Sequence, residues 1–400
     1  MSDPQPHNRL VHTIALTLNR LGDGLVDPKL VLAWLVTSLG AGAFWVGLLV
    51  PLREAGALLP QLFTASRLRF VPVRKWWWVF GAVVQALAVA GMVVTALTLT
   101  GAAAGAAIAT LVAVFAVARS ISSVSYKDVL GKTVDKPRRG EVSGTAASIA
   151  AAGILVFGLV LLFGVAEYSL IVIGALSIAS LCWLLAAITF AQLIEEPSVI
   201  TANRQASAFK LYLHYLKTDR ELQKFLVVRG LLVATAVTPP FLILLANTAA
   251  DSFVAQLGAL VVASSLAGFV SGRVWGKLSD YSTAIVMSVC GMVTSVTLVG
   301  AVAAQTTNLY STLWFLPLVL FLIMVMYQGV RIARNIHLVN IAKEDTRAGY
   351  TAVSNTIIGI LMLLTGGLGI IAELTSVGST LLVLAGMSLL GGLLALRLKT

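Results

Sequence analysis

Long apolar runs, each about as long as a bilayer core is thick, fill most of the chain. Several of them, such as residues 76–98 and 169–193, contain no charged side chain. An α-helix of about 20 apolar residues crosses the hydrocarbon core and satisfies its own backbone polar groups there. With 11% charged residues among 400, the chain has too little charge to cover a soluble domain of this size. The sequence therefore predicts an all-α polytopic membrane protein.

Counting runs of this length gives twelve predicted transmembrane helices. The first six are expected at 16–39, 44–66, 76–98, 102–126, 144–165 and 169–193. The second six are expected at 224–246, 252–275, 282–303, 311–335, 351–372 and 377–397. Pro239 and Pro240 fall inside the seventh span and are expected to break it, because proline removes a backbone donor.

Lysine and arginine are distributed asymmetrically about this predicted membrane. One side receives 23 of the 28 basic residues, whereas the loops near 41, 100, 167, 250, 307 and 375 contain none. Since cytoplasmic loops carry an excess of Lys and Arg, both termini are predicted to be cytoplasmic. The expected location is the plasma membrane, such as a bacterial inner membrane. This distribution also accounts for the net charge of +11 without a nucleic-acid partner.

Two stretches of the chain share one layout. Residues 118–121 (ARSI) and 333–336 (ARNI) each precede a block of charge, after which 145–148 (TAAS) and 351–354 (TAVS) also correspond. Self-similarity at a nearly fixed offset indicates duplicated structural units. The sequence therefore predicts two pseudo-symmetric six-helix bundles.

The predicted domain boundaries follow from this duplication. An N-terminal bundle is expected at 1–194, a cytoplasmic linker at 195–223 and a C-terminal bundle at 224–400. Within the linker, apolar side chains at i, i+3, i+4 and i+7 predict a short amphipathic helix on the inner membrane surface. These side chains are Phe209, Tyr212, Leu213 and Leu216.

Twelve spans in two similar halves, with a long central loop, resemble the major facilitator superfamily (MFS) across essentially the whole chain. The superfamily pattern G-x-L-x-D-x-x-G-R-R follows span 2 or span 8. The second half keeps Gly276, Leu278 and Asp280 without the basic end, and the first half keeps only the basic end, Arg74 and Lys75. Span 5 lacks a Gly-Pro pair, so the drug-antiporter signature is not met.

The resemblance implies a secondary transporter whose bundles rock around a site near the bilayer midplane. Arg119 matches the arginine of the superfamily's R-x-x-Q-G pattern in span 4. Arg74, Lys75, Gly276 and Asp280 would form a conformational latch that holds one state. The alternative interpretation of these two loops is that they are topology signals only.

Charged residues inside the spans indicate a structural or functional role, because placing each one in the membrane costs at least ~2.5 kcal/mol on insertion scales. Spans 1 and 2 carry six that sum to zero: Arg20, Asp23, Asp27, Lys29, Arg53 and Glu54. Arg20, Asp23 and Asp27 stand at i, i+3 and i+7, which predicts one helical stripe. Such a self-neutralising cluster suits ion coupling or binding of a charged solute. Glu54, followed by Asp27, is the predicted proton carrier.

Two other interpretations of this cluster stay open. The charges would form a salt-bridge lattice that only holds spans 1 and 2 together, or residues 20–29 would lie at the cytoplasmic interface. Arg119 and Arg229 complete the predicted coupling and substrate residues, Arg229 being the clear buried charge of the second half before span 10.

No pattern in the sequence indicates an enzyme. The motifs H-E-x-x-H, G-x-S-x-G and G-x-x-x-x-G-K-[ST] do not occur. No metal or cofactor is expected apart from a proton as the coupling ion. The expected partners are a small solute and membrane lipid, and the expected oligomeric state is a monomer. The predicted function is secondary active transport by alternating access; the alternative is a non-transporting relative that serves as a membrane sensor or assembly factor.

Overall fold

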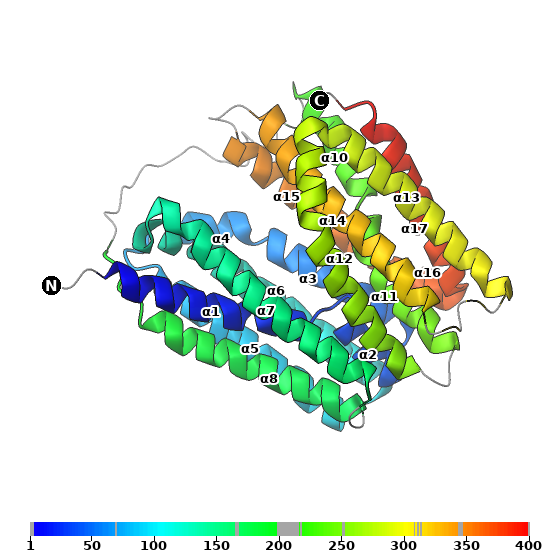
Figure 1. The fold of residues 1–400 in the computed structure, drawn as a ribbon, viewed down its shortest axis with the longest axis horizontal. Helices are drawn as coiled ribbons and strands as arrows, with labels where there is room; N and C mark the ends of the chain where they lie inside the picture. The colour runs from blue at the N-terminus through cyan, green and yellow to red at the C-terminus, as the bar shows by residue number, and fades with distance from the viewer. Residues whose placement is uncertain are drawn as a thin grey trace. The chain divides into compact units, whose positions relative to one another are not determined.

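A computed structural model shows an all-helical chain (Figure 1). It describes residues 4–68, 70–164, 168–197, 216, 218–249, 253–307, 309, 312, 314–342 and 347–398, and these contain no β-strand. Nine helices of this described part are long and apolar enough to cross a bilayer, or ten if a bent pair within one helix is counted as a span. The protein is therefore a multi-pass membrane protein. Most of the amphipathic stretch predicted in the linker lies outside the described residues.

The chain forms two compact units. Unit 1 contains Met1–Ala41, Leu52–Phe157 and Val165–Arg204, and unit 2 contains Gly42–Pro51, Gly158–Gly164 and Gln205–Thr400. The predicted boundaries at 194 and 224 stay predictions.

The helices that begin before residue 200 are long where the sequence is uniformly apolar and short where proline or glycine interrupts it. They are α1 (Gln5–Leu25), α2 (Val31–Ser38), α3 (Ala43–Leu58), α4 (Gln61–Leu68), α5 (Lys75–Thr98), α6 (Gly101–Thr133), α7 (Arg139–Leu162) and α8 (Tyr168–Ala191). Within unit 1, α5 packs against both α6 and α8, and α8 packs against α1.

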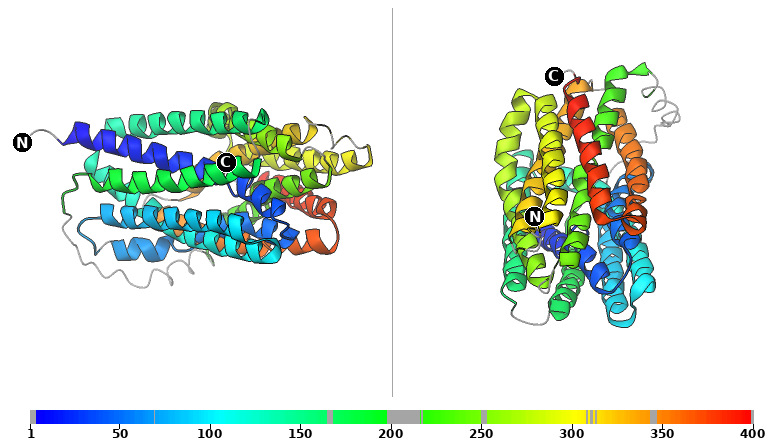
Figure 2. Two further views of the ribbon diagram at one scale, coloured as in Figure 1. Left: turned by 90° about the horizontal axis from the view of Figure 1, so that it is seen from below. Right: turned by 90° about the vertical axis from the view of Figure 1, so that its right-hand side faces the viewer.

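The helices described after residue 218 lie in unit 2. They are α10 (Arg220–Leu231), α11 (Ala234–Ala249), α12 (Phe253–Tyr281), α13 (Thr283–Ala303), α14 (Phe315–Ile341), α15 (Arg347–Thr365), α16 (Leu368–Leu374) and α17 (Val377–Ala395). Helices α13 and α17 run side by side, in yellow and red in Figures 1 and 2. Gly291 allows them to approach closely, because an added Cβ there would lie 2.6 Å from the Ser388 carbonyl oxygen and 2.8 Å from the Gly392 Cα.

The first predicted helix differs from the structure in its start and in its continuity. Helix α1 begins at Gln5, eleven residues before the predicted start, and the chain leaves helical geometry between Leu25 and Val31. Pro28 lies in this break and cannot donate a backbone hydrogen bond. Asp27 satisfies the local backbone instead: its Oδ1 accepts from Lys29 N at 2.8 Å. The prediction that Asp27 continues one helical stripe from Arg20 is therefore wrong, because α1 ends before Asp27.

The seventh predicted span is broken at a different place from the one expected. Helix α11 runs through Pro239 and Pro240, whereas the interruption falls at residues 232–233. At this break Thr235 donates its hydroxyl to the Leu232 carbonyl at 2.8 Å, which satisfies a carbonyl there. The expectation that the proline pair breaks the helix is wrong.

Gly81 allows α5 and α6 to approach closely. A Cβ at this position would lie 2.2 Å from Ser122 Oγ and 2.7 Å from the Ala118 carbonyl oxygen. We expect Gly81→Ala to destabilise the protein by about 1–3 kcal/mol through overpacking, measured as a lower melting temperature in detergent. Gly131→Ala in α6 is the matched control, because a Cβ there meets nothing within 4 Å. Equal melting temperatures for the two variants would contradict this account of the α5–α6 contact.

Candidate functional site

Asp23 of α1 lies at the centre of a charged cluster inside unit 1. Its Oδ1 accepts from Arg53 Nη2 at 3.2 Å, and its Oδ2 accepts from Arg119 Nη2. The side chains of all three residues are mostly buried, with 16–28% of their surface exposed. One carboxylate therefore joins three helices, α1, α3 and α6.

Aromatic side chains support the Arg53 guanidinium. Its Cζ lies 4.8 Å from the ring centroid of Phe115, which meets the ring of Trp183 edge-on at 5.0 Å. Trp183 Nε1 donates to Asn19 Oδ1 at 3.0 Å, which links these aromatic side chains to α1. A cation over an aromatic face gains about 2 kcal/mol or more when desolvated. Arg53 is thus held between a carboxylate and a ring.

Asp27, Lys29 and Glu54 extend the cluster. Asp27 lies in the break after α1 and interacts electrostatically with Lys29, Arg53 and Glu54. Lys29 is 7% exposed. Five of the six charges predicted in spans 1 and 2, together with Arg119, thus come together in unit 1. Arg53 therefore interacts with Asp23, 30 residues away in the sequence, as well as with its neighbour Glu54.

The sixth charge, Arg20, has a separate position. Its Nη1 donates to the Ser143 carbonyl at 2.8 Å. Arg20 also lines a cavity of about 230 Å³ in unit 1, whose other lining residues are Leu16, Asn19, Trp78, Arg119, Ser122, Ser123, Tyr126 and Lys127. Arg119 therefore faces both Asp23 and this cavity. The lining offers cations, hydroxyls and an amide to a polar guest.

Arg229 of α10 is the corresponding buried charge of unit 2, with 5% of its surface exposed. Its Nη1 donates to Ser354 Oγ and its Nη2 donates to Asn355 Oδ1 at 3.2 Å. Both acceptors are neutral and belong to α15. Arg229 thus ties α10 to α15 through hydrogen bonds of a different kind from the carboxylate contacts of unit 1.

The repeated arginines differ in their surroundings. Arg119 and Arg334 occupy matching places in the ARSI and ARNI stretches, in α6 and α14. Arg119 pairs with Asp23, whereas the Nε of Arg334 is buried without a hydrogen-bond partner among the described residues. Among the described contacts, the ion pair of Arg119 therefore has no counterpart at the Nε of Arg334.

Of the residues predicted to form a latch, Arg74 and Lys75 belong to unit 1, and Gly276 and Asp280 belong to unit 2. Arg74 Nη1 pairs with Asp128 Oδ2 at 2.9 Å within unit 1, and Lys75 Nζ donates to the Ala191 carbonyl at 2.8 Å. In unit 2, Asp280 is exposed and a Cβ on Gly276 would meet open space. The latch role of these residues stays a prediction.

Glu195 is a buried acid that the sequence assigned only to the linker. Its carboxylate accepts from Arg74 N at 3.0 Å, Lys75 N at 2.7 Å and Lys132 Nζ at 2.9 Å, and its side chain has no exposed surface. The first two donors are at the N-terminus of α5, where orphan N–H groups and the helix dipole favour an anion. Glu195 therefore fixes the chain that leaves α8 to the start of α5. The sequence signal is an acid that directly follows an apolar span.

Asn19, Phe115 and Trp183 are neutral residues within apolar runs, and sequence reasoning missed them. Only their neighbours in space show that they support Arg53. Within the described part of the chain, no group of three or more His, Cys, Asp or Glu side chains is placed to hold a metal ion.

Comparison with solved structures shows that the chain shares its fold with known membrane transporters. A mutant of the nucleoside transporter NupG matches with a TM-score of 0.76 and 15% identity, over 98% of this chain and 100% of that chain. A POT family transporter bound to a thioalcohol-conjugated peptide matches with a TM-score of 0.75 and 9% identity, over 97% and 95%. A D-xylose-proton symporter matches with a TM-score of 0.67 and 11% identity, over 98% of each chain. No family model matches the sequence, and no curated protein matches it.

Proposed function

We propose that this protein is a secondary active transporter that moves a small polar solute by alternating access, coupled to protons. The observation that carries the proposal is the cluster around Asp23, in which six basic and acidic positions predicted from sequence meet inside unit 1. Buried charges of this kind are retained in membrane proteins chiefly for ion and substrate pathways. The likeness to transporters of nucleosides, peptides and xylose supports it.

The proposal includes the twelve-span topology. Four of the spans are broken, and each consists of two consecutive helices. These pairs are α1 with α2, α3 with α4, α10 with α11, and α15 with α16. With α5, α6, α7, α8, α12, α13, α14 and α17 these make twelve, six on each side of the linker 195–223. The bundles are 1–194 and 224–400, both termini are cytoplasmic, and the monomer lies in the plasma membrane. Labelling of single cysteines at Gly101 and Gly378 from outside, and at Asp135 only from inside, tests this topology.

Coupling is assigned to the acids at the edge of the cluster. Asp23 is engaged by two guanidinium groups, whereas Asp27 lies in non-helical backbone beside Lys29. Glu54 interacts electrostatically with both Asp27 and Arg53. Protonation of Asp27 or Glu54 removes a negative charge from the cluster. It therefore weakens the electrostatic attraction on Arg53 and, for Asp27, on Lys29. That change provides a physical link between a proton and helix position.

The test begins with a screen for metabolites and drugs whose cellular content depends on the protein. The solute found is then studied in proteoliposomes with an imposed pH gradient. We expect Asp27→Asn combined with Glu54→Gln to abolish uphill transport while solute exchange without a gradient persists. The matched control, Glu141→Gln, removes an acid from an exposed pair with Arg138 and should leave uphill transport intact.

Two results would overturn the proposal in different ways. Uphill transport with intact pH dependence in the double variant would place proton coupling elsewhere in the chain. If no solute moved and the double variant had no phenotype, the alternative of a membrane sensor or assembly factor would be favoured.

A further inference from the structure

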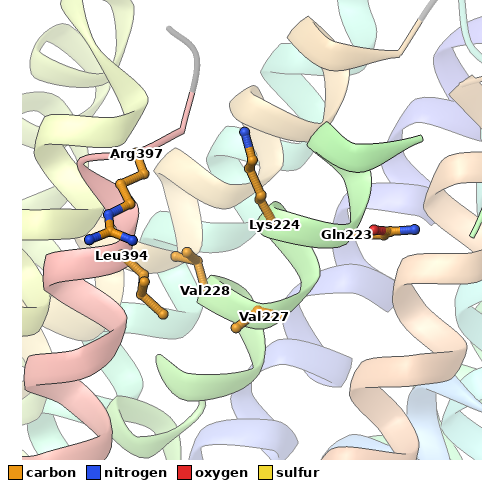
Figure 3. A pocket seen from close by; sticks show the side chains of 6 residues that line it. All are labelled: Gln223, Lys224, Val227, Val228, Leu394 and Arg397. Carbon is orange, nitrogen blue, oxygen red and sulfur yellow. The ribbon is translucent and has the colours of Figure 1, made fainter. Parts of the chain in front are cut away.

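A cavity of about 310 Å³ lies between α10 and α17 in unit 2 (Figure 3). It is lined by Gln223, Lys224, Val227, Val228, Leu394 and Arg397. Lys224 comes from α10, and Arg397 comes from the turn that follows α17. The valine and leucine side chains supply the remainder of its wall. The cavity therefore combines two cationic side chains, Lys224 and Arg397, with an apolar wall.

The two cations are available to an external anion. Lys224 Nζ pairs with Glu221 Oε1 at 3.0 Å, with 49% and 26% of the two side chains exposed. Exposed pairs of this kind contribute little free energy, and an incoming anion competes with them. Arg397 is exposed and makes no ion pair within the described part of the chain. Gln223, a neutral lining residue, donates to the Leu216 carbonyl at 2.6 Å.

An apolar groove continues from this cavity. A second cavity of about 450 Å³ shares Val227 with the first, and its further lining residues are Gly230, Leu231, Leu361, Leu364, Thr365, Leu368 and Met387. Helix α10 packs against both α15 and α17, so it forms the base between them. Val227 and Leu364 are more than half exposed. The surface therefore combines a cationic end with a long apolar strip.

The cationic end lies where lipid headgroups are found. Lys224 is in the second turn of α10 and Arg397 follows the end of α17, so both mark the same membrane edge. The positive-inside rule assigns this edge to the cytoplasmic leaflet. That leaflet carries anionic lipids, which basic residues near the surface attract. Guanidinium groups also bind phosphate oxygens in a bidentate geometry.

We propose that this surface binds one anionic phospholipid of the cytoplasmic leaflet. Lys224 and Arg397 hold its phosphate group, and an acyl chain follows the groove from Val227 to Leu364. The lipid covers the groove between α15 and α17 and thereby joins these helices to α10. The proposal does not depend on the identity of the transported solute, because none of Arg229, Ser354 and Asn355 lines either cavity.

The test uses the full-length purified protein in detergent and native mass spectrometry. Phosphatidylglycerol, phosphatidylcholine and inorganic phosphate are the probes. We expect Lys224→Gln combined with Arg397→Gln to weaken phosphatidylglycerol binding about tenfold or more, since each basic residue near the surface adds to the attraction. Glu221→Gln removes the competing carboxylate and should strengthen binding. Arg397→Lys, which keeps the charge, should retain most of it.

The matched control variant is Arg220→Gln combined with Arg331→Gln, which removes two exposed cations of unit 2 that do not line either cavity. It should bind phosphatidylglycerol as the parent does. The proposal is overturned if the control loses as much binding as the test variant, or if the test variant loses none. Equal binding of phosphatidylcholine would show an apolar site only, and displacement by inorganic phosphate would show a free-anion site; either result also overturns it.

Discussion

Replacing Asp23 with asparagine is expected to lower the melting temperature of the purified protein by several degrees and to abolish transport. Asp23 is the acceptor for Arg53 and for Arg119. An asparagine leaves both mostly buried guanidinium groups without a negative partner. Removing one member of a buried ion pair costs about 3–5 kcal/mol, because the remaining charge stays desolvated. Thermal unfolding in detergent measures this loss, and surface expression shows whether the variant still inserts.

The matched control for this prediction is Glu141→Gln. Glu141 pairs with Arg138 at 2.9 Å, but both side chains are more than half exposed. Pairs of this kind contribute about 0–1 kcal/mol, so the control should melt as the parent does. If Asp23→Asn also melted at the parental temperature, the cluster would not hold α1, α3 and α6 together. Loss of transport at an unchanged melting temperature would assign Asp23 to the transport cycle alone.

Glu195→Gln is expected to be the second strongly destabilising change. The carboxylate oxygens of Glu195 accept from two backbone N–H groups of α5 and from Lys132. Glutamine replaces one acceptor oxygen with an amide donor that faces another donor. Each hydrogen bond to a charged group contributes about 1.5–3 kcal/mol, and an unsatisfied buried donor costs a similar amount. We expect a loss of about 3 kcal/mol, read as a lower melting temperature.

Glu196→Gln provides a control one residue away, because Glu196 is exposed. It removes the same charge from the same segment without touching α5. Limited proteolysis in the linker adds a second measurement: only Glu195→Gln should speed cleavage after α8, since it frees the chain there. Equal cleavage rates for both variants would show that Glu195 does not anchor this segment.

The long apolar helices could be predicted from sequence because hydrophobicity over about 20 residues is a strong and local signal. Helices α5 and α8 begin and end within two residues of the predicted 76–98 and 169–193. The breaks could not be placed in this way. The chain bends around Pro28 but continues through Pro239 and Pro240, because neighbouring groups decide whether freed carbonyls are satisfied. The positions of these neighbouring groups depend on the tertiary structure and cannot be inferred from local sequence.

The charged members of the candidate site were found from sequence because a charge within an apolar run is conspicuous. Their pairing was not, since Arg53 lies 30 residues from Asp23 and Arg119 lies farther still. Phe115 and Asn19 give no sequence signal at all. An aromatic ring under a guanidinium is indistinguishable from any other core residue until the helices are placed.

The unequal surroundings of Arg119 and Arg334 have a consequence for stoichiometry. If each repeat had kept its own acid beside this arginine, the protein would have two equivalent proton-binding sites in each transport cycle. Instead the three acids of the cluster, Asp23, Asp27 and Glu54, all belong to the first repeat. On the proposed function, one half of the molecule therefore sets how many ions move per solute. The other half is free to diverge in what it recognises.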